Sequence, residues 1–108
     1  MSNILGSLAQ LVPAASILTT LYTCPANTTV ALSCIFITNL TSGSDTAYLS
    51  IAPQGIADDP SQYLYYGLVI DGVDTFTNIF SLSLVGGDVV RCMSGSGNLA
   101  FNLFGNTL

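Results

Sequence analysis

Residues 30–39 read Val-Ala-Leu-Ser-Cys-Ile-Phe-Ile-Thr-Asn, and the fold depends on this stretch. β-Branched and aromatic residues favour strands, and the side chains of a strand alternate between its two faces. One face of the stretch carries Val30, Leu32, Cys34 and Phe36, and the other carries Ala31, Ser33, Ile35 and Ile37. Both faces are mostly apolar, which predicts a central strand that is covered on both sides.

Two further stretches alternate more cleanly. In Asp74–Leu84, one face carries Phe76, Asn78, Phe80, Leu82 and Leu84, and the other carries Thr75, Thr77, Ile79, Ser81 and Ser83. This pattern is typical of a half-buried antiparallel strand. In Leu99–Phe104, Leu99, Phe101 and Leu103 share one face, so that Phe104 on the other face is expected to meet a neighbour.

The remaining strand candidates are short and are separated by turn residues such as Asp71-Gly72 and Gly86-Gly87-Asp88. They are Ile17–Thr23, Ala47–Pro53, Leu64–Ile70 and Val89–Met93. About seven short strands predict a single all-β domain, an antiparallel β-sandwich of Ig-like or jelly-roll type, over residues 17–108. The best short helical turn is Asp59–Gln62, where Asp59 can cap the turn and Pro60 can occupy its first position.

Residues 1–16 are expected to form a separate apolar N-terminal arm. Ile4, Leu5, Leu8, Leu11 and Val12 supply its apolar side chains, and they fit a helical stripe only loosely. An uncharged apolar segment is unfavourable in water, which leaves two alternatives. The segment packs on its own domain as a strand or arm, or it reaches across to a neighbouring subunit through Ile4, Leu5 and Leu8.

Formal charge is scarce in this chain of 108 residues. Six Asp and the single Arg91 are the charged residues, or 6% of the chain, against about 25% in ordinary soluble domains. With one cation the chain cannot neutralise nucleic-acid phosphates or anionic membrane surfaces. We expect neither a signal peptide nor a transmembrane helix, because no basic residue precedes the apolar start and no run of about 18 apolar residues occurs.

The residues that usually carry catalysis are nearly absent. The chain has no His, Lys or Glu, so a Cys nucleophile lacks a base or cation to activate it. The sequence therefore predicts no enzyme and no cofactor. Asp71 and Asp74 are expected to make turn hydrogen bonds, with a calcium site as the lesser alternative. The three cysteines Cys24, Cys34 and Cys92 are expected to be free thiols, since their number is odd. A disulfide between Cys34 and Cys92 across the sandwich is the lesser alternative.

Two further features suggest protein contacts. Tyr63, Tyr65 and Tyr66 form an aromatic cluster, in which Tyr63 and Tyr65 share a face if the chain is extended. Tyrosine suits a core, a subunit interface or a ligand platform. Arg91 is expected to face solvent or to bridge an Asp, either Asp88 or one of a neighbouring subunit.

Several segments resemble a family of small β-rich virion proteins of tailed bacteriophages, including phages of cyanobacteria. They are Leu18–Thr23 with Pro25, Ile51-Ala52-Pro53, Gln62–Tyr66, Asp74-Thr75, Asp88–Arg91 and Phe101–Gly105. The resemblance implies a capsid decoration or cement protein on the capsid surface, assembled in the host cytoplasm. Its partners would be itself, with a trimer favoured, and the major capsid protein. The alternative is a tail, baseplate or fibre-associated protein, which could include a carbohydrate- or calcium-binding module.

Overall fold

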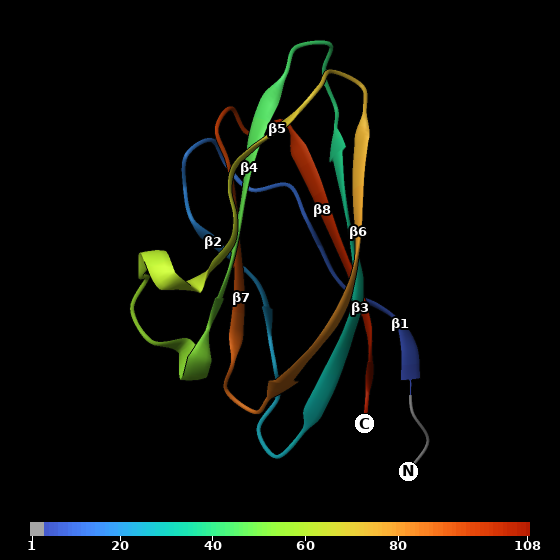
Figure 1. Cartoon of the computed structure of the whole chain (residues 1–108), viewed down its shortest axis with the longest axis vertical. Helices are drawn as coiled ribbons and strands as arrows, with labels where there is room; N and C mark the ends of the chain where they lie inside the picture. The colour runs from blue at the N-terminus through green and yellow to red at the C-terminus, as the bar shows by residue number, and fades with distance from the viewer. Residues whose placement is uncertain (1–3) are drawn as a thin grey trace.

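The computed structural model describes residues 4–108, with side chains from residue 6 onward. These residues form eight strands and two short 3₁₀ turns (Figure 1). The strands are β1 (Ile4–Leu11), β2 (Thr19–Thr23), β3 (Thr29–Asn39), β4 (Asp45–Ala52), β5 (Tyr63–Ile70), β6 (Thr75–Val85), β7 (Val89–Ser94) and β8 (Leu99–Thr107). The all-β sandwich expected from the sequence is confirmed, and β1 is the strand that the count of about seven omitted.

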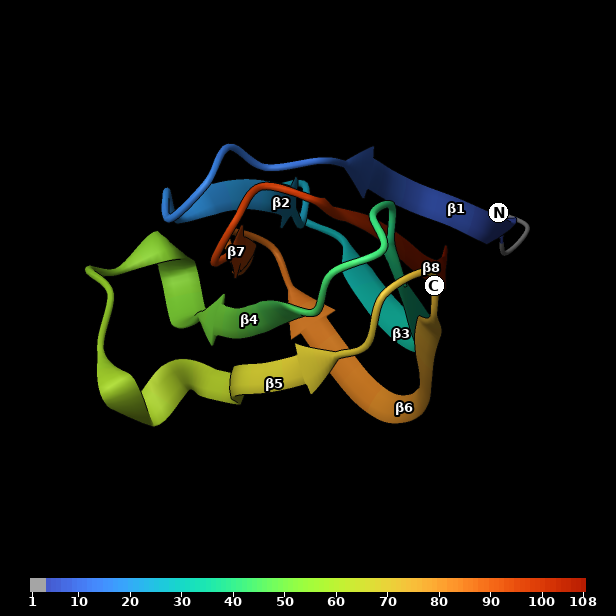
Figure 2. The same ribbon diagram turned by 90° about the horizontal axis from the view of Figure 1, so that it is seen from above.

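The strands make two four-stranded antiparallel sheets. Sheet A has the order β1-β8-β3-β6, and sheet B has the order β2-β7-β4-β5. The first strand pairs with the eighth, the second with the seventh, the third with the sixth and the fourth with the fifth. A chain folded back in these nested pairs and rolled into two sheets is a jelly roll, so the jelly-roll alternative holds. The two sheets face one another in Figures 1 and 2.

The interior of the sandwich is apolar and well buried. Its largest fully buried side chains include Phe101, Ile35, Ile37, Leu49 and Leu103. The clean alternation expected for β6 and β8 is confirmed, because Leu99, Phe101 and Leu103 are buried while the odd-numbered residues of β6 are exposed. Burying one face of each sheet against the other supplies the main stabilisation of such a fold.

The alternation expected for β3 is wrong after Leu32. Between Leu32 and Cys34 the register with β8 shifts so that Ser33 is an extra residue of β3 relative to β8. The register with β6 shifts at the same point, with the extra residue on the β6 side. Such a β-bulge reverses the faces of every residue that follows it. Ile35 and Ile37 therefore join Val30 and Leu32 in the core, and Cys34 and Phe36 lie on the outside. Phe36 is 38% exposed, so β3 is central in its sheet but covered on one face only.

Residues 4–11 form an edge strand of sheet A. β1 pairs with β8 from Ile4 opposite Thr107 to Leu11 opposite Phe101, with a register shift around Leu8. Leu8 packs against the core of its own domain. Of the two expected arrangements, residues 4–11 adopt the strand that packs on its own domain. β8 gains a partner for its otherwise open edge, which is the physical reason for the pairing.

The turns at the ends of the sheets are held by side chains of the strands. Asn39 is buried, and its amide donates to the carbonyls of Gly43 (2.8 Å) and Ile70 (3.0 Å). Its Oδ1 accepts from the backbone N–H of Thr41 (3.0 Å). Asp45 is also buried, and its carboxylate accepts from the backbone N–H groups of Ser96 (2.9 Å) and Asn98 (3.2 Å). These polar groups satisfy backbone atoms that would otherwise be orphaned.

Candidate functional site

The outer face of sheet A carries no formal charge. None of the residues in β1, β3, β6 and β8 is Asp, Glu, Lys or Arg, so the six Asp and Arg91 all lie in sheet B or in the connecting loops. Apolar, hydroxyl and amide side chains make up this face instead. They include Cys34, Phe36, Thr38, Thr75, Thr77, Ile79, Ser81, Asn102 and Phe104. We call this surface the uncharged face.

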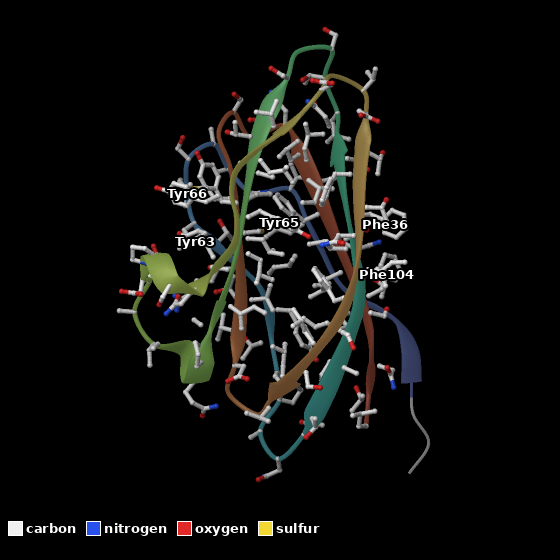
Figure 3. The ribbon with its side chains drawn as sticks, in the orientation of Figure 1. Phe36, Tyr63, Tyr65, Tyr66 and Phe104 are labelled. Carbon is white, nitrogen blue, oxygen red and sulfur yellow. The ribbon has the colours of Figure 1, made fainter. Side chains whose placement is uncertain are left out.

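An aromatic pair lies on the uncharged face. Phe36 and Phe104 meet edge to face with ring centroids 5.6 Å apart, and Figure 3 shows both rings on the outer side of their sheet. Cys34 has Phe104 and Ile79 as its two cross-strand neighbours. Ile79 is 81% exposed. Exposed large apolar side chains gathered on one sheet face are typical of a surface that another molecule covers.

A second aromatic cluster lies on the opposite side of the molecule. Tyr66 meets both Tyr48 and Tyr63 edge to face, each with ring centroids 5.1 Å apart. Tyr66 is 76% exposed. Figure 3 shows Tyr63 and Tyr66 on the outside of sheet B, and Tyr65 between the sheets. We call this surface, with Arg91, the tyrosine face.

Bulges in β5 decide which tyrosines are outside. Its register with β4 shifts twice, at Gly67, which has φ +75°, and at Leu64. A glycine adopts such a φ without steric cost, and each extra residue reverses the alternation. Tyr63 therefore shares a face with Tyr66 rather than with Tyr65, which corrects the expectation for an extended chain. Tyr65 packs on Phe76 (5.3 Å) and accepts a hydrogen bond from Asn78 Nδ2.

Arg91 lies beside this cluster. Arg91 and Tyr63 are the two cross-strand neighbours of Ser50 on the outside of sheet B. Arg91 Nη2 donates to the carbonyl of Gly55 (3.2 Å). The Tyr63 hydroxyl donates to Asp58 Oδ2 (3.1 Å), and burial, followed by this hydrogen bond, raises the pKa of Tyr63. The cation and the tyrosines thus form one mixed polar and aromatic surface.

Asp88 anchors the loop that Arg91 touches. Its Oδ1 accepts from the backbone N–H and the side-chain amide of Gln54 (both 3.0 Å), and its Oδ2 accepts from the backbone N–H of Val85 (3.0 Å). The hydrogen bond from Val85, followed by that from the backbone of Gln54, lowers the pKa of Asp88. Asp88 is therefore engaged with backbone groups, while Arg91 binds a carbonyl of the same loop.

The loop between β4 and β5 encloses a shallow, open cavity of about 510 Å³. Ile51, Ile56, Asp58 and Asp59 are among the residues that line it. Asp59 caps the turn Pro60–Gln62, as expected from the sequence, by accepting from the backbone N–H of Ser61 (3.0 Å). The hydrogen bond from the Ser61 hydroxyl, followed by this backbone bond, lowers the pKa of Asp59. The cavity could hold a small polar ligand, although its carboxylates are already hydrogen-bonded.

The cysteines and the remaining aspartates have few chemical roles open to them. The three cysteines are free, as expected. Cys24 and Cys92 are buried, and burial raises the pKa of Cys92 to about 12, which disfavours a thiolate. Asp71 and Asp74 lie in the expected turn, in which the backbone carbonyl of Asp71 accepts from the N–H of Asp74 (3.2 Å) and Asp74 Oδ1 accepts from the N–H of Thr75 (2.9 Å). In the part of the chain that the structure describes, no three His, Cys, Asp or Glu residues gather as metal ligands do.

The residues singled out in the sequence fall into four groups, one of which is Tyr65 alone, packed on Phe76 between the sheets (Figure 3). Tyr63, Tyr66 and Arg91 come together on the tyrosine face, which Tyr48 completes. Phe104 lies on the opposite, uncharged face with Phe36. Ile4, Leu5 and Leu8 lie in β1, and the side chains of Ile4 and Leu5 fall outside the described residues. Tyr48 and Phe36 were missed because their facing partners depend on register, which local alternation does not reveal.

Comparison with known proteins gives no match to a protein-family model, to a curated protein or to a solved structure. Among the described residues, no helix has both the length and the apolar character to span a membrane.

Proposed function

We propose that this chain is a non-enzymatic structural protein of a bacteriophage virion. Its most specific form is a capsid decoration or cement protein that bridges major capsid subunits as a small homo-oligomer. The observation that carries the proposal is the uncharged face, a whole four-stranded sheet without a formal charge and with exposed Phe36 and Ile79. Permanent protein contacts are more apolar than ordinary surfaces and are depleted in charge.

A bridging protein needs contact surfaces on two sides. This sandwich has an aromatic cluster on each outer side, with Phe36 and Phe104 on sheet A and Tyr48, Tyr63 and Tyr66 on sheet B. The tyrosine face adds Arg91, and Tyr and Arg are the residue types that most often carry interface binding energy. The segments that resemble phage virion proteins, such as Gln62–Tyr66 and Asp88–Arg91, include parts of this face.

The architecture agrees with the proposal but does not carry it. Jelly rolls recur in viral capsid domains and in lectins, and one fold serves many functions. The surfaces of the sandwich carry the proposal, and the lack of charge on the uncharged face supports a partner that is present throughout the life of the protein.

Binding to empty capsid shells of the phage that encodes the chain tests this function. We expect saturable co-sedimentation with the shells, weakened in a Tyr66→Ser variant, because Tyr66 is 76% exposed and its loss leaves the core intact. Val73→Ser is the control, since Val73 is 80% exposed on the turn between β5 and β6 and is not one of the tyrosine-face residues. Shells that bind none of the wild-type protein would contradict the capsid role.

The cavity and the nearby tyrosines favour one second candidate, a carbohydrate- or calcium-binding module associated with a tail or fibre. Asp58 both lines the cavity and accepts from Tyr63, and aromatic rings with carboxylates suit a polyhydroxylated ligand. A ligand that binds the folded state raises the melting temperature. A panel of glycans and calcium that leaves the melting temperature unchanged would exclude this candidate.

A further inference from the structure

We infer that the uncharged face is the self-association surface of this protein and joins two copies face to face about a two-fold axis. The inference rests on the proposed function, which includes a small homo-oligomer, and it names the surface through which the copies associate. It replaces the expected trimer by a dimer, because one face that meets its own copy makes an isologous contact with two-fold symmetry. The tyrosine face is then left free for the capsid.

The distribution of charge selects a second copy as the occupant. The chain has a net charge of −5, so copies that meet through most surfaces repel one another. The uncharged face is the exception, since Asp45, Asp58, Asp59, Asp71, Asp74 and Asp88 all lie in sheet B or in loops. Two copies in contact through sheet A keep their carboxylates at the rim and on the far sides.

The size of the face is adequate for a dimer. Four strands at a spacing of about 4.8 Å, with about nine residues each at a rise of about 3.3 Å, cover a plan area of about 570 Å². Two such faces bury about 1,100 Å², which exceeds the roughly 1,000 Å² expected of a specific interface. A distinct charged partner would need a complementary charge, and this face offers it none.

The thiol of Cys34 lies in the middle of the uncharged face and can be labelled chemically. Cys34 lies between Phe104 on β8 and Ile79 on β6. It is partly exposed, whereas Cys24 is 1% exposed and Cys92 is fully buried. A thiol reagent applied to the folded protein therefore reports on Cys34, and a copy seated on the face should protect it.

The test compares lysine substitutions on the two sides of the sandwich, in the absence of shells. Ile79→Lys puts a charge on the uncharged face. Val69→Lys is the matched control, because Val69 is 62% exposed in β5 of sheet B and the charge change is the same. Sedimentation velocity, at concentrations up to about 100 µM, gives the oligomer. Melting temperatures confirm that both variants fold.

We expect the wild type and Val69→Lys to dimerise, and Ile79→Lys to dissociate with an affinity at least about tenfold lower, because a buried unpaired charge is costly. Maleimide labelling of Cys34 should slow as the wild-type dimer forms, and Cys34→Ser should remove that labelling. A dimer that survives Ile79→Lys with unprotected Cys34, or one lost in Val69→Lys, overturns the inference. A wild-type protein that stays monomeric also overturns the inference. If that monomer binds capsid shells and Ile79→Lys abolishes the binding, the uncharged face contacts the capsid instead, and the proposed capsid role is supported.

Discussion

Phe36 and Phe104 meet edge to face on the outside of sheet A, with ring centroids 5.6 Å apart. They come from the neighbouring strands β3 and β8, and neither ring belongs to the core. Phe101, on the same strand as Phe104, is fully buried. The two sides of β8 thus bear phenylalanines in different environments. Substitutions on the outer face and in the core should therefore differ in their effect on the free energy of unfolding.

Phe36→Ala is expected to cost about 1 kcal/mol of unfolding free energy, the value of a lost aromatic pair. Phe101→Ala is expected to cost about 3–5 kcal/mol, because it leaves a cavity in the core. Urea denaturation followed by circular dichroism measures both. Equal losses for the two variants would mean that Phe36 supports the fold rather than a contact surface.

The backbone at Gly105 is closely approached by β3. A Cβ on Gly105 would clash with the backbone carbonyl oxygen of Ala31 and would lie 3.0 Å from Leu8 Cδ1. Gly105→Ala should therefore destabilise the protein by about 1–3 kcal/mol through overpacking. Gly6, its partner across the β1–β8 pair, has nothing within 4 Å of such an atom. Gly6→Ala is the control and should change the unfolding free energy by no more than about 0.5 kcal/mol.

Reductant should leave the melting temperature unchanged. The bulge at Ser33 turns Cys34 to the outside of sheet A, while Cys92 lies inside the sandwich, so no disulfide joins the sheets. Differential scanning fluorimetry with and without dithiothreitol checks this. A marked fall in melting temperature would reveal a bridge, because loss of a native disulfide typically costs about 2–5 kcal/mol.

Asp88 should make stability depend on pH. Hydrogen bonds from Val85 and Gln54 lower its pKa in the folded state, whereas the unfolded value is about 3.9. A lowered folded pKa adds stability that is present above the unfolded pKa and is lost as the pH falls through the folded pKa. Asp88→Asn should therefore be less stable than the wild type at neutral pH. The difference should shrink below about pH 4, and a difference that is constant from neutral to acid pH would contradict this role.

The buried face of a strand could be predicted from the sequence wherever its side chains alternate regularly between the two faces. In β6 and β8 the faces follow simple alternation from end to end, and the Asp59 cap is equally local. β3, β5 and β1 contain extra residues at Ser33, Leu64, Gly67 and around Leu8. A bulge is fixed by pairing with another strand, so the alternation of one segment does not locate it.

The same cause limited the prediction of the candidate site. Tyr63, Tyr66 and Arg91 could be singled out as unusual residues, but their grouping with Tyr48 depends on the register between β4 and β5. Phe36 was assigned to the same face as Leu32, and the bulge at Ser33 separates them. The absence of charge from sheet A could be recognised only once the strand order was known, since its four strands are scattered along the chain.

The most direct test of the central proposal is the number of chains bound per major capsid subunit on purified empty shells of the phage that, under the proposal, encodes the protein. Quantitative mass analysis of shells titrated with the wild-type chain gives this ratio. The proposal predicts saturation at a fixed, simple ratio set by the symmetry of the shell. Binding that is absent, or that rises without a plateau, would contradict the claim that this chain is a capsid cement protein.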